Sequence, residues 1–223
     1  MIPLTMKEVE ELNFAFEPLI QHTNHDGSPI TNGIKLHPTL SDFELIEPLH
    51  DPKSGLLSLC IHHRKSNLQI FSSGPMKSFT DARDVMRMFF SGGKSEQLNA
   101  LETFVKRRRR PGSPLLFIGQ SFGGYLSIEA AKKFDGLFIA SNPAYYHAEK
   151  AEEKWHDQGI NFLVSNDWLT AHTRPYLPGQ KEYVEGTSGH NTADIWKQLG
   201  HRMIGIFLDQ REGSDLKKLL LLG

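Results

Sequence analysis

The sequence contains a single cysteine, Cys60, so no disulfide can form within the chain. Cys60 lies in the apolar run LLSLCI, where a thiol more often packs as a small hydrophobic side chain than reacts. The eleven histidines are scattered and not placed at metal-ligand spacing. We therefore expect no disulfide-stabilised scaffold, no metal site and no other cofactor.

The sequence also lacks any run of 18 apolar residues, so it predicts no membrane-spanning helix. The segment MIPLTMKEVEEL is too polar for a signal peptide, which makes the cytoplasm the expected location and leaves export without a cleavable signal open. Lys and Arg number 25 against 26 Asp and Glu. This balance argues against a general nucleic-acid-binding surface.

The 223 residues, 39% of them hydrophobic, can form one large α/β domain, so we expect a single domain over residues 1–223. Within it, residues 1–55 are expected to form a helix and an irregular segment that packs on the rest. Thr5-Met6-Lys7-Glu8 fits a capping box, and apolar residues follow at helical spacing as far as Leu19. Residues 21–42 are rich in turn-forming residues and predict a long irregular connection.

Apolar runs that alternate with helical patterns make up most of the remaining chain. Residues 56–62 and 68–72 flank a polar turn and predict an antiparallel hairpin. Further strands are expected at residues 115–118, 137–140, 160–164 and 203–208, and helices at 79–90, 96–106, 124–134 and 192–199. This alternation predicts an α/β fold in which helices cover both faces of a mainly parallel central sheet.

The segment Gly119-Gln120-Ser121-Phe122-Gly123 lies between an apolar run and a helical pattern. Where a strand reverses sharply into a helix, the residues two before and two after the turn residue come together, so glycine is favoured at both places. The same turn presents the side chain of Ser121 outward. The pattern therefore predicts a nucleophilic serine.

A serine hydroxyl is a weak nucleophile at neutral pH and needs a histidine base and a carboxylate that orients the histidine. For a serine at such a turn, the carboxylate precedes the histidine along the chain. Asp167 follows the predicted strand 160–164 and is the candidate acid. Asp135 and Asp157 precede strands, so they should lie at the opposite edge of the sheet.

His190 is the candidate base because it lies in a loop rich in glycine and serine, between the acid and the predicted helix 192–199. His172 and His201 are the alternatives. His172 is only five residues from Asp167, and His201 falls at the start of a predicted strand. All three histidines remain candidates on the sequence alone.

The negative charge that develops on the substrate oxygen needs fixed hydrogen-bond donors. The backbone amide of Phe122, directly after the serine, is one candidate. Ser73 is the second, because it follows an earlier predicted strand and precedes a glycine. A substrate is expected to contact four further side chains: Gln120, Met86, Phe89 and Tyr145. Residues 76–90 are either a mobile apolar lid or part of the core.

The succession IFSSGP, SFTDARDVM, LLFIGQSFGGYLSIEAA, FIASNPA, VSND and GHN resembles the class 3 lipase family of α/β hydrolases over about residues 56–192. The resemblance implies an α/β-hydrolase fold with Ser121 as nucleophile, Asp167 as acid and His190 as base. It also implies that the oxyanion lies near Phe122 and Ser73. The family includes triacylglycerol lipases, phospholipases and esterases, so it implies a lipid or other carboxylic ester as substrate.

Three departures from the family pattern are visible. Gln120 stands where the family usually has histidine, Trp168 follows the acid where proline is common, and the segment 72–75 is offset from the usual F-R-G-T. Other readings therefore stay open. A thioesterase or an amidase would use the same three catalytic groups, and a non-catalytic protein could use the same fold for binding.

Five consecutive basic residues precede Pro111 at a predicted helix end: Lys106, Arg107, Arg108, Arg109 and Arg110. Cations at this place complement the helix dipole, which favours a solvated surface cluster. The alternative is attraction to an anionic membrane surface, which would suit an enzyme that acts on lipids.

Overall fold

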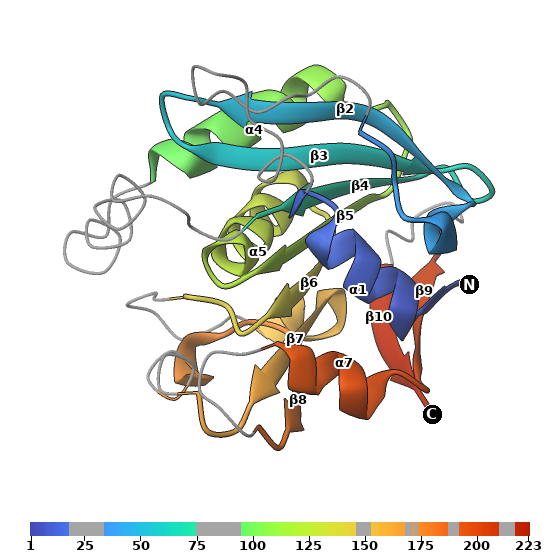
Figure 1. Cartoon of the computed structure of the whole chain (residues 1–223), viewed down its shortest axis with the longest axis vertical. Helices are drawn as coiled ribbons and strands as arrows, with labels where there is room; N and C mark the ends of the chain where they lie inside the picture. The colour runs from blue at the N-terminus through green and yellow to red at the C-terminus, as the bar shows by residue number, and fades with distance from the viewer. Residues whose placement is uncertain are drawn as a thin grey trace.

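The computed structural model describes residues 1–17, 34–74, 95–145, 153–167, 171, 174–186, 192–209 and 217–223. Its centre is a seven-stranded sheet with the order β2-β3-β4-β5-β6-β7-β8 (Figure 1). The strands of this sheet are β2 (Phe43–Asp51), β3 (Leu56–His63), β4 (Leu68–Ser73), β5 (Leu115–Gln120), β6 (Leu137–Ser141), β7 (Gly159–Val164) and β8 (Gln180–Val184). Neighbours from β4 to β8 are parallel, and β2, β3 and β4 pair antiparallel. The predicted hairpin and the mainly parallel sheet are confirmed.

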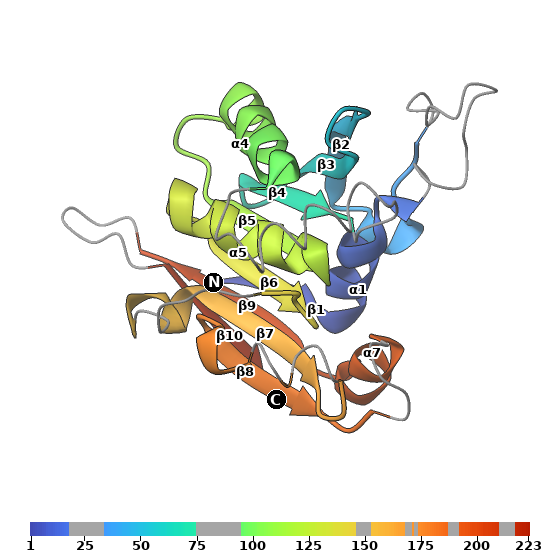
Figure 2. The same ribbon diagram turned by 90° about the vertical axis from the view of Figure 1, so that its left-hand side faces the viewer.

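Helices cover both faces of this sheet, as predicted. On one face, α4 (Glu96–Arg108) and α5 (Phe122–Phe134) lie side by side (Figure 2) and pack against inward side chains such as Phe71 and Phe117. On the other face, α1 (Met6–Phe14) and α7 (Ala193–Leu199) pack against Leu116 and Ile118 (Figure 1). Strands buried on both faces read as continuous apolar runs, which is why the sequence revealed β5, β6 and β7.

A second, three-stranded sheet has the order β1-β9-β10 and packs on the same face as α1 and α7. It consists of β1 (Ile2–Thr5), β9 (Met203–Leu208) and β10 (Lys217–Leu222), all antiparallel. Residues 203–208 are therefore a strand, as expected, but they do not complete the central sheet. Strand β8 does so instead, and it escaped prediction because its exposed, alternating residues QKEYV do not form an apolar run.

The opening helix begins as the sequence predicts. The hydroxyl of Thr5 accepts from the Glu8 amide at 3.1 Å, and the Glu8 carboxylate accepts from the Thr5 amide at 2.8 Å. The description of residues 1–55 as helix plus irregular segment was incomplete, because β1 and β2 are paired strands in the two sheets. The expected helix 79–90 lies outside the described residues. Short 3₁₀ turns occur at η1 (Pro38–Leu40), η2 (Glu153–Gln158) and η3 (Arg174–Tyr176).

Candidate active site

Ser121 occupies the turn between β5 and α5 with φ of 54° and ψ of −119°. A non-glycine residue held in such a sparsely populated backbone region costs about 1–3 kcal/mol, and such residues cluster at functional sites. The turn is tied to the neighbouring strand β6, because the Ser121 backbone amide donates to the Ser141 carbonyl at 2.9 Å. The residue is partly exposed. The chain thus holds this partly exposed serine in a strained backbone conformation.

The glycines of the motif allow three backbone segments to meet at this turn. A Cβ at Gly119 would lie 2.2 Å from the Gly123 carbonyl oxygen, and a Cβ at Gly123 would lie 2.2 Å from the Ser73 carbonyl oxygen. Neither distance leaves room for any side chain. The spatial reason for Gly at both positions, which the sequence suggested, is therefore present in the structure.

Asp167 follows β7 at the same edge of the sheet as Ser121, because both residues come after the carboxyl ends of parallel strands. Two strand spacings separate β5 from β7, which corresponds to about 10 Å. Asp167 is fully buried, its amide donates to the Val164 carbonyl at 3.1 Å, and its carbonyl accepts from the Ala171 amide at 3.0 Å. A fixed, buried carboxylate suits the role of an orienting acid.

The two rival carboxylates lie at the opposite edge of the sheet, as expected. Asp135 is the C-cap of α5 directly before β6, and it forms an ion pair with Lys217. Asp157 lies just before β7 and forms an ion pair with Lys218 at 3.0 Å. Because both precede strands that run toward Ser121, neither is placed to serve it.

His190, the candidate base, lies outside the described residues, as does the alternative His172. His201 is exposed in the turn before β9. The nearest described residue after His190 is Thr192, the N-cap of α7, which is buried and whose hydroxyl donates to Gln120 Oε1 at 3.3 Å. The choice of His190 stays a prediction.

Phe122 and Ser73 were the predicted oxyanion donors. Phe122 is the first residue of α5, where the backbone amide has no partner within the helix and the helix dipole favours negative charge. Ser73 ends β4 beside Gly123, but its side chain is buried and its hydroxyl lies 3.3 Å from that of Ser58. Ser73 therefore remains a candidate through its position, and its hydroxyl already has a neighbour in the sheet.

Two of the four predicted substrate contacts, Gln120 and Tyr145, have partners within the protein. The side-chain oxygen of Gln120 accepts from Asn13 Nδ2 and from Thr192 Oγ1, both at 3.3 Å, so it joins protein segments. Tyr145 is 1% exposed, and its hydroxyl donates to Glu129 at 3.0 Å. Burial, helped by the Glu129 carboxylate, raises the pKa of Tyr145. Tyr145 is thus a packing residue in this structure, while Met86 and Phe89 lie outside the described residues.

Sequence reasoning overlooked Asn142, which directly follows β6. It is fully buried with φ of 42°, and its side-chain oxygen accepts from the Val164 amide at 2.9 Å. Asparagine tolerates this left-handed conformation better than most residues. The sequence shows Asn142-Pro143 after an apolar run, which predicts a turn. It does not show that the asparagine side chain also bonds to the neighbouring strand.

The basic cluster 106–110 lies at the sheet edge opposite Ser121. Arg107 and Arg108 form ion pairs with Glu47 of β2. Arg109 and Arg110 line a cavity of about 440 Å³ together with Lys217. The helix-end interpretation accounts for the location, whereas contact of these residues with an anionic membrane stays a prediction.

Two further properties concern the described residues only. None of the helices seen there is long and apolar enough to cross a membrane. In the same part of the chain, no three His, Cys, Asp or Glu side chains are grouped so that they could hold a metal ion.

Comparison with solved structures shows that lipases have a similar fold. A nonglycosylated lipase of Yarrowia lipolytica is 12% identical with a TM-score of 0.52, over 81% of this chain and 79% of that one. A lipase of Rhizopus microsporus var. chinensis is also 12% identical with a TM-score of 0.50, over 84% of this chain and 79% of that one. No family model and no curated protein matches the sequence. At this identity the likeness shows the fold, which is of the α/β-hydrolase type.

Proposed function

We propose that the protein is a serine hydrolase that cleaves carboxylic esters, with Ser121 as nucleophile, His190 as base and Asp167 as orienting acid. One observation carries the proposal: Ser121 is partly exposed and held in a strained backbone conformation at a strand-to-helix turn, where glycine would relieve the strain. A protein that used this fold only for binding would have no need of a strained serine at this place.

In the proposed reaction, His190 takes the proton of the Ser121 hydroxyl while the oxygen attacks the acyl carbon of the ester. The negative charge that forms on the substrate oxygen is stabilised by the amide of Phe122 at the start of α5, with Ser73 as the second candidate. The protonated histidine then gives its proton to the departing alcohol. Water, activated by the same histidine, releases the acid and restores Ser121.

The proposed substrate class is the lipid ester. The solved structures with a similar fold carry the name lipase, and the sequence resembles class 3 lipases at the elbow and at the acid. A thioesterase or an amidase would use the same catalytic groups, so the leaving group is the property that the experiment must separate.

Covalent labelling with a fluorophosphonate tests the mechanism. The wild-type protein should be labelled at one site, and Ser121→Ala should abolish both labelling and ester cleavage. Ser141→Ala is the matched control: Ser141 is a fully buried serine on the neighbouring strand, and its hydroxyl has no hydrogen-bond partner among the described residues. A folded wild-type protein that is not labelled would refute the proposal.

The other two groups are tested by Asp167→Asn and His190→Ala. In such a triad, loss of the orienting acid lowers kcat by about 10⁴-fold and loss of the histidine by about 10⁶-fold. Assays with nitrophenyl esters of increasing chain length, acyl-CoA and a peptide substrate then separate an esterase from a thioesterase and an amidase. If labelling occurs but acyl-CoA is cleaved faster than every ester, the mechanism stands and the ester assignment fails.

A further inference from the structure

Two amide side chains flank Ser121 at adjacent strand ends. Gln120 is the last residue of β5, and its register partner on β6 is Ser141, which directly precedes Asn142. Neither amide belongs to the three proposed catalytic groups. Each makes hydrogen bonds that lead away from Ser121 toward a different part of the chain.

Asn142 connects the Ser121 turn with the strand that carries the acid. Its backbone amide donates to the Phe162 carbonyl, and its side-chain oxygen accepts from the Val164 backbone amide, both at 2.9 Å. The Val164 carbonyl in turn accepts from the Asp167 amide at 3.1 Å. Asn142 therefore joins the end of β6 to the segment that fixes Asp167.

The Ser121 turn is hydrogen-bonded to residues before and after Asn142 in the chain. The Ser121 amide donates to the carbonyl of Ser141, and the Ser121 carbonyl accepts from the amide of Ala144, each at 2.9 Å. Hydrogen bonds, linked by the peptide bonds on either side of Asn142, thus connect the proposed nucleophile with the segment that carries the proposed acid. Because Asn142 and Val164 are fully buried, water cannot replace these bonds without opening the structure.

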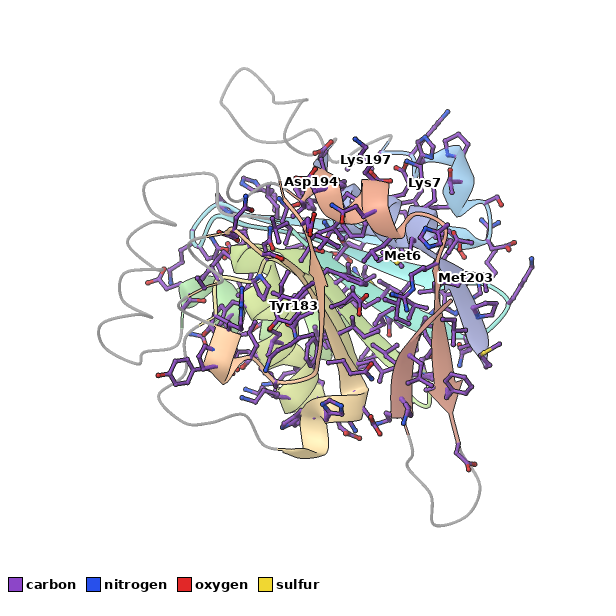
Figure 3. All side chains as sticks on the ribbon, turned by 90° about the horizontal axis from the view of Figure 1, so that it is seen from below. Met6, Lys7, Tyr183, Asp194, Lys197 and Met203 are labelled. Atoms are coloured by element: carbon purple, nitrogen blue, oxygen red, sulfur yellow. The ribbon has the colours of Figure 1, made fainter. Side chains whose placement is uncertain are left out.

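Gln120 connects the same turn with α1 and α7. Its side-chain oxygen accepts from Asn13 of α1 and from Thr192, the N-cap of α7, both at 3.3 Å. The two helices lie side by side (Figure 3), and the ring of Phe14 meets that of Trp196 edge-on at 6.3 Å. Gln120 is therefore hydrogen-bonded to Thr192, which lies two residues after the proposed base His190 in the sequence.

We propose that Asn142 and Gln120 are positioning residues of the proposed hydrolase: Asn142 sets Asp167 against Ser121, and Gln120 sets the chain that carries His190. This inference rests on the proposed function. In this proposal, neither side chain takes part in the chemical step. Their contribution is geometric, and a displacement of about 1 Å in a catalytic group can lower the rate by about 100-fold.

The Asn142→Gly variant tests the first connection. Glycine keeps the left-handed backbone and removes the acceptor for the Val164 amide. We expect kcat to fall by at least about tenfold with KM within about twofold of wild type, because a misplaced acid affects the chemical step and not substrate binding.

Asn161→Ala is the matched control for this variant. Asn161 is also a fully buried asparagine on β7, and its side chain donates to the Pro178 carbonyl at 2.6 Å, away from Ser121. Both variants should lower the unfolding midpoint to a similar extent, but only Asn142→Gly should lower kcat. Equal losses of kcat in the two variants would reduce Asn142 to a structural role and overturn the inference.

The Gln120→Leu variant tests the second connection, with Gln120→Glu as the conservative partner. Leucine removes the acceptor, whereas glutamate keeps an oxygen for Asn13 and Thr192. We expect Gln120→Leu to lower kcat and the fluorophosphonate labelling rate by about tenfold, and Gln120→Glu to retain most of both. Equal activity of the two variants would show that the acceptor does not position the base.

The double variant Asn142→Gly with Gln120→Leu gives the last test. Groups that act as one catalytic unit show losses that do not add. We therefore expect its kcat to lie within about threefold of the slower single variant, whereas multiplied losses would indicate two independent structural defects. An unlabelled, inactive wild type refutes the proposed function and the positioning with it. A labelled wild type whose single variants keep wild-type kcat refutes the positioning alone.

Discussion

Replacement of Gly123 by alanine tests the close approach between the Ser121 turn and the end of β4. The added methyl carbon would lie 2.2 Å from the carbonyl oxygen of Ser73 and 2.6 Å from that of Gly74. Favourable nonbonded separations are about 3.5 Å, so the two segments must move apart by about 1 Å. Both obstructing atoms belong to the backbone, and no side-chain rotation can relieve the overlap.

The magnitude follows from two opposing effects. Overpacking costs about 1–3 kcal/mol, and a clash with backbone belongs at the upper end of that range. Alanine in place of glycine within a helix stabilises by up to about 1 kcal/mol. We therefore expect the Gly123→Ala variant to lose about 2 kcal/mol of unfolding free energy, which for a domain of this size lowers the midpoint by about 4–8 °C.

Gly124→Ala, one residue further along α5, is the control. Its methyl carbon would lie 2.9 Å from the Cβ and 3.1 Å from the Cα of Pro143, so its overlap is much smaller than the overlap at Gly123. The helix gain is the same, so its unfolding free energy should stay within about 1 kcal/mol of wild type. Urea unfolding followed by circular dichroism measures both variants. Equal stability of Gly123→Ala and Gly124→Ala would refute the steric argument.

Three further outcomes are expected. Burial lowers the pKa of His63, so below about pH 6.5 the unfolded chain binds this proton more readily than the folded one, and the free energy of unfolding falls as the pH drops. Urea unfolding at pH 7 and pH 5 should show a smaller loss of unfolding free energy in His63→Gln than in wild type. An equal loss in the two proteins would contradict this. Burial raises the pKa of the Cys60 thiol, so a thiol reagent should modify the denatured protein and spare the native one. Glu47 pairs with Arg107 and Arg108 from a half-buried position, so Glu47→Gln should cost about 1 kcal/mol at low salt and less at high salt. Equal stability of Glu47→Gln and wild type at low salt would show that the pairs contribute nothing.

The sequence predicts the strand-turn-helix around Ser121 because its signals are local. Glycine spacing, the apolar run before it and the helical pattern after it all fall within residues 114–134. The place of Asp167 follows from the same reasoning, since a residue after a parallel strand must lie at the carboxyl edge. Local pattern and strand direction were sufficient for these two residues.

Long-range pairing was beyond the sequence pattern. Nothing in residues 203–208 indicates that β9 pairs with β1 and β10 and stays out of the central sheet. Strand β8 is an edge strand with exposed alternate residues, so it lacks the apolar run that revealed its neighbours. The choice of partner depends on which strands the whole chain leaves available.

The side-chain roles were the least predictable part of the candidate site. Gln120 was expected to meet a substrate and instead accepts hydrogen bonds from Asn13 and Thr192, which are distant in sequence. Tyr145 was expected at a substrate surface and lies buried against α5. Neither set of partners could be predicted, because a polar residue near a turn carries no local sign of the direction in which it points.

Because β1 pairs with β9, residues 2–5 cannot complete their sheet until residues 203–208 are present. On the ribosome, β1 is synthesised long before β9, the strand with which it pairs. Until then, β1, which leads into α1, lacks its pairing partner. Asn13 of α1 is then not held in place to donate its hydrogen bond to Gln120. A nascent polypeptide would therefore gain its complete frame around Ser121 only after β9 has been made.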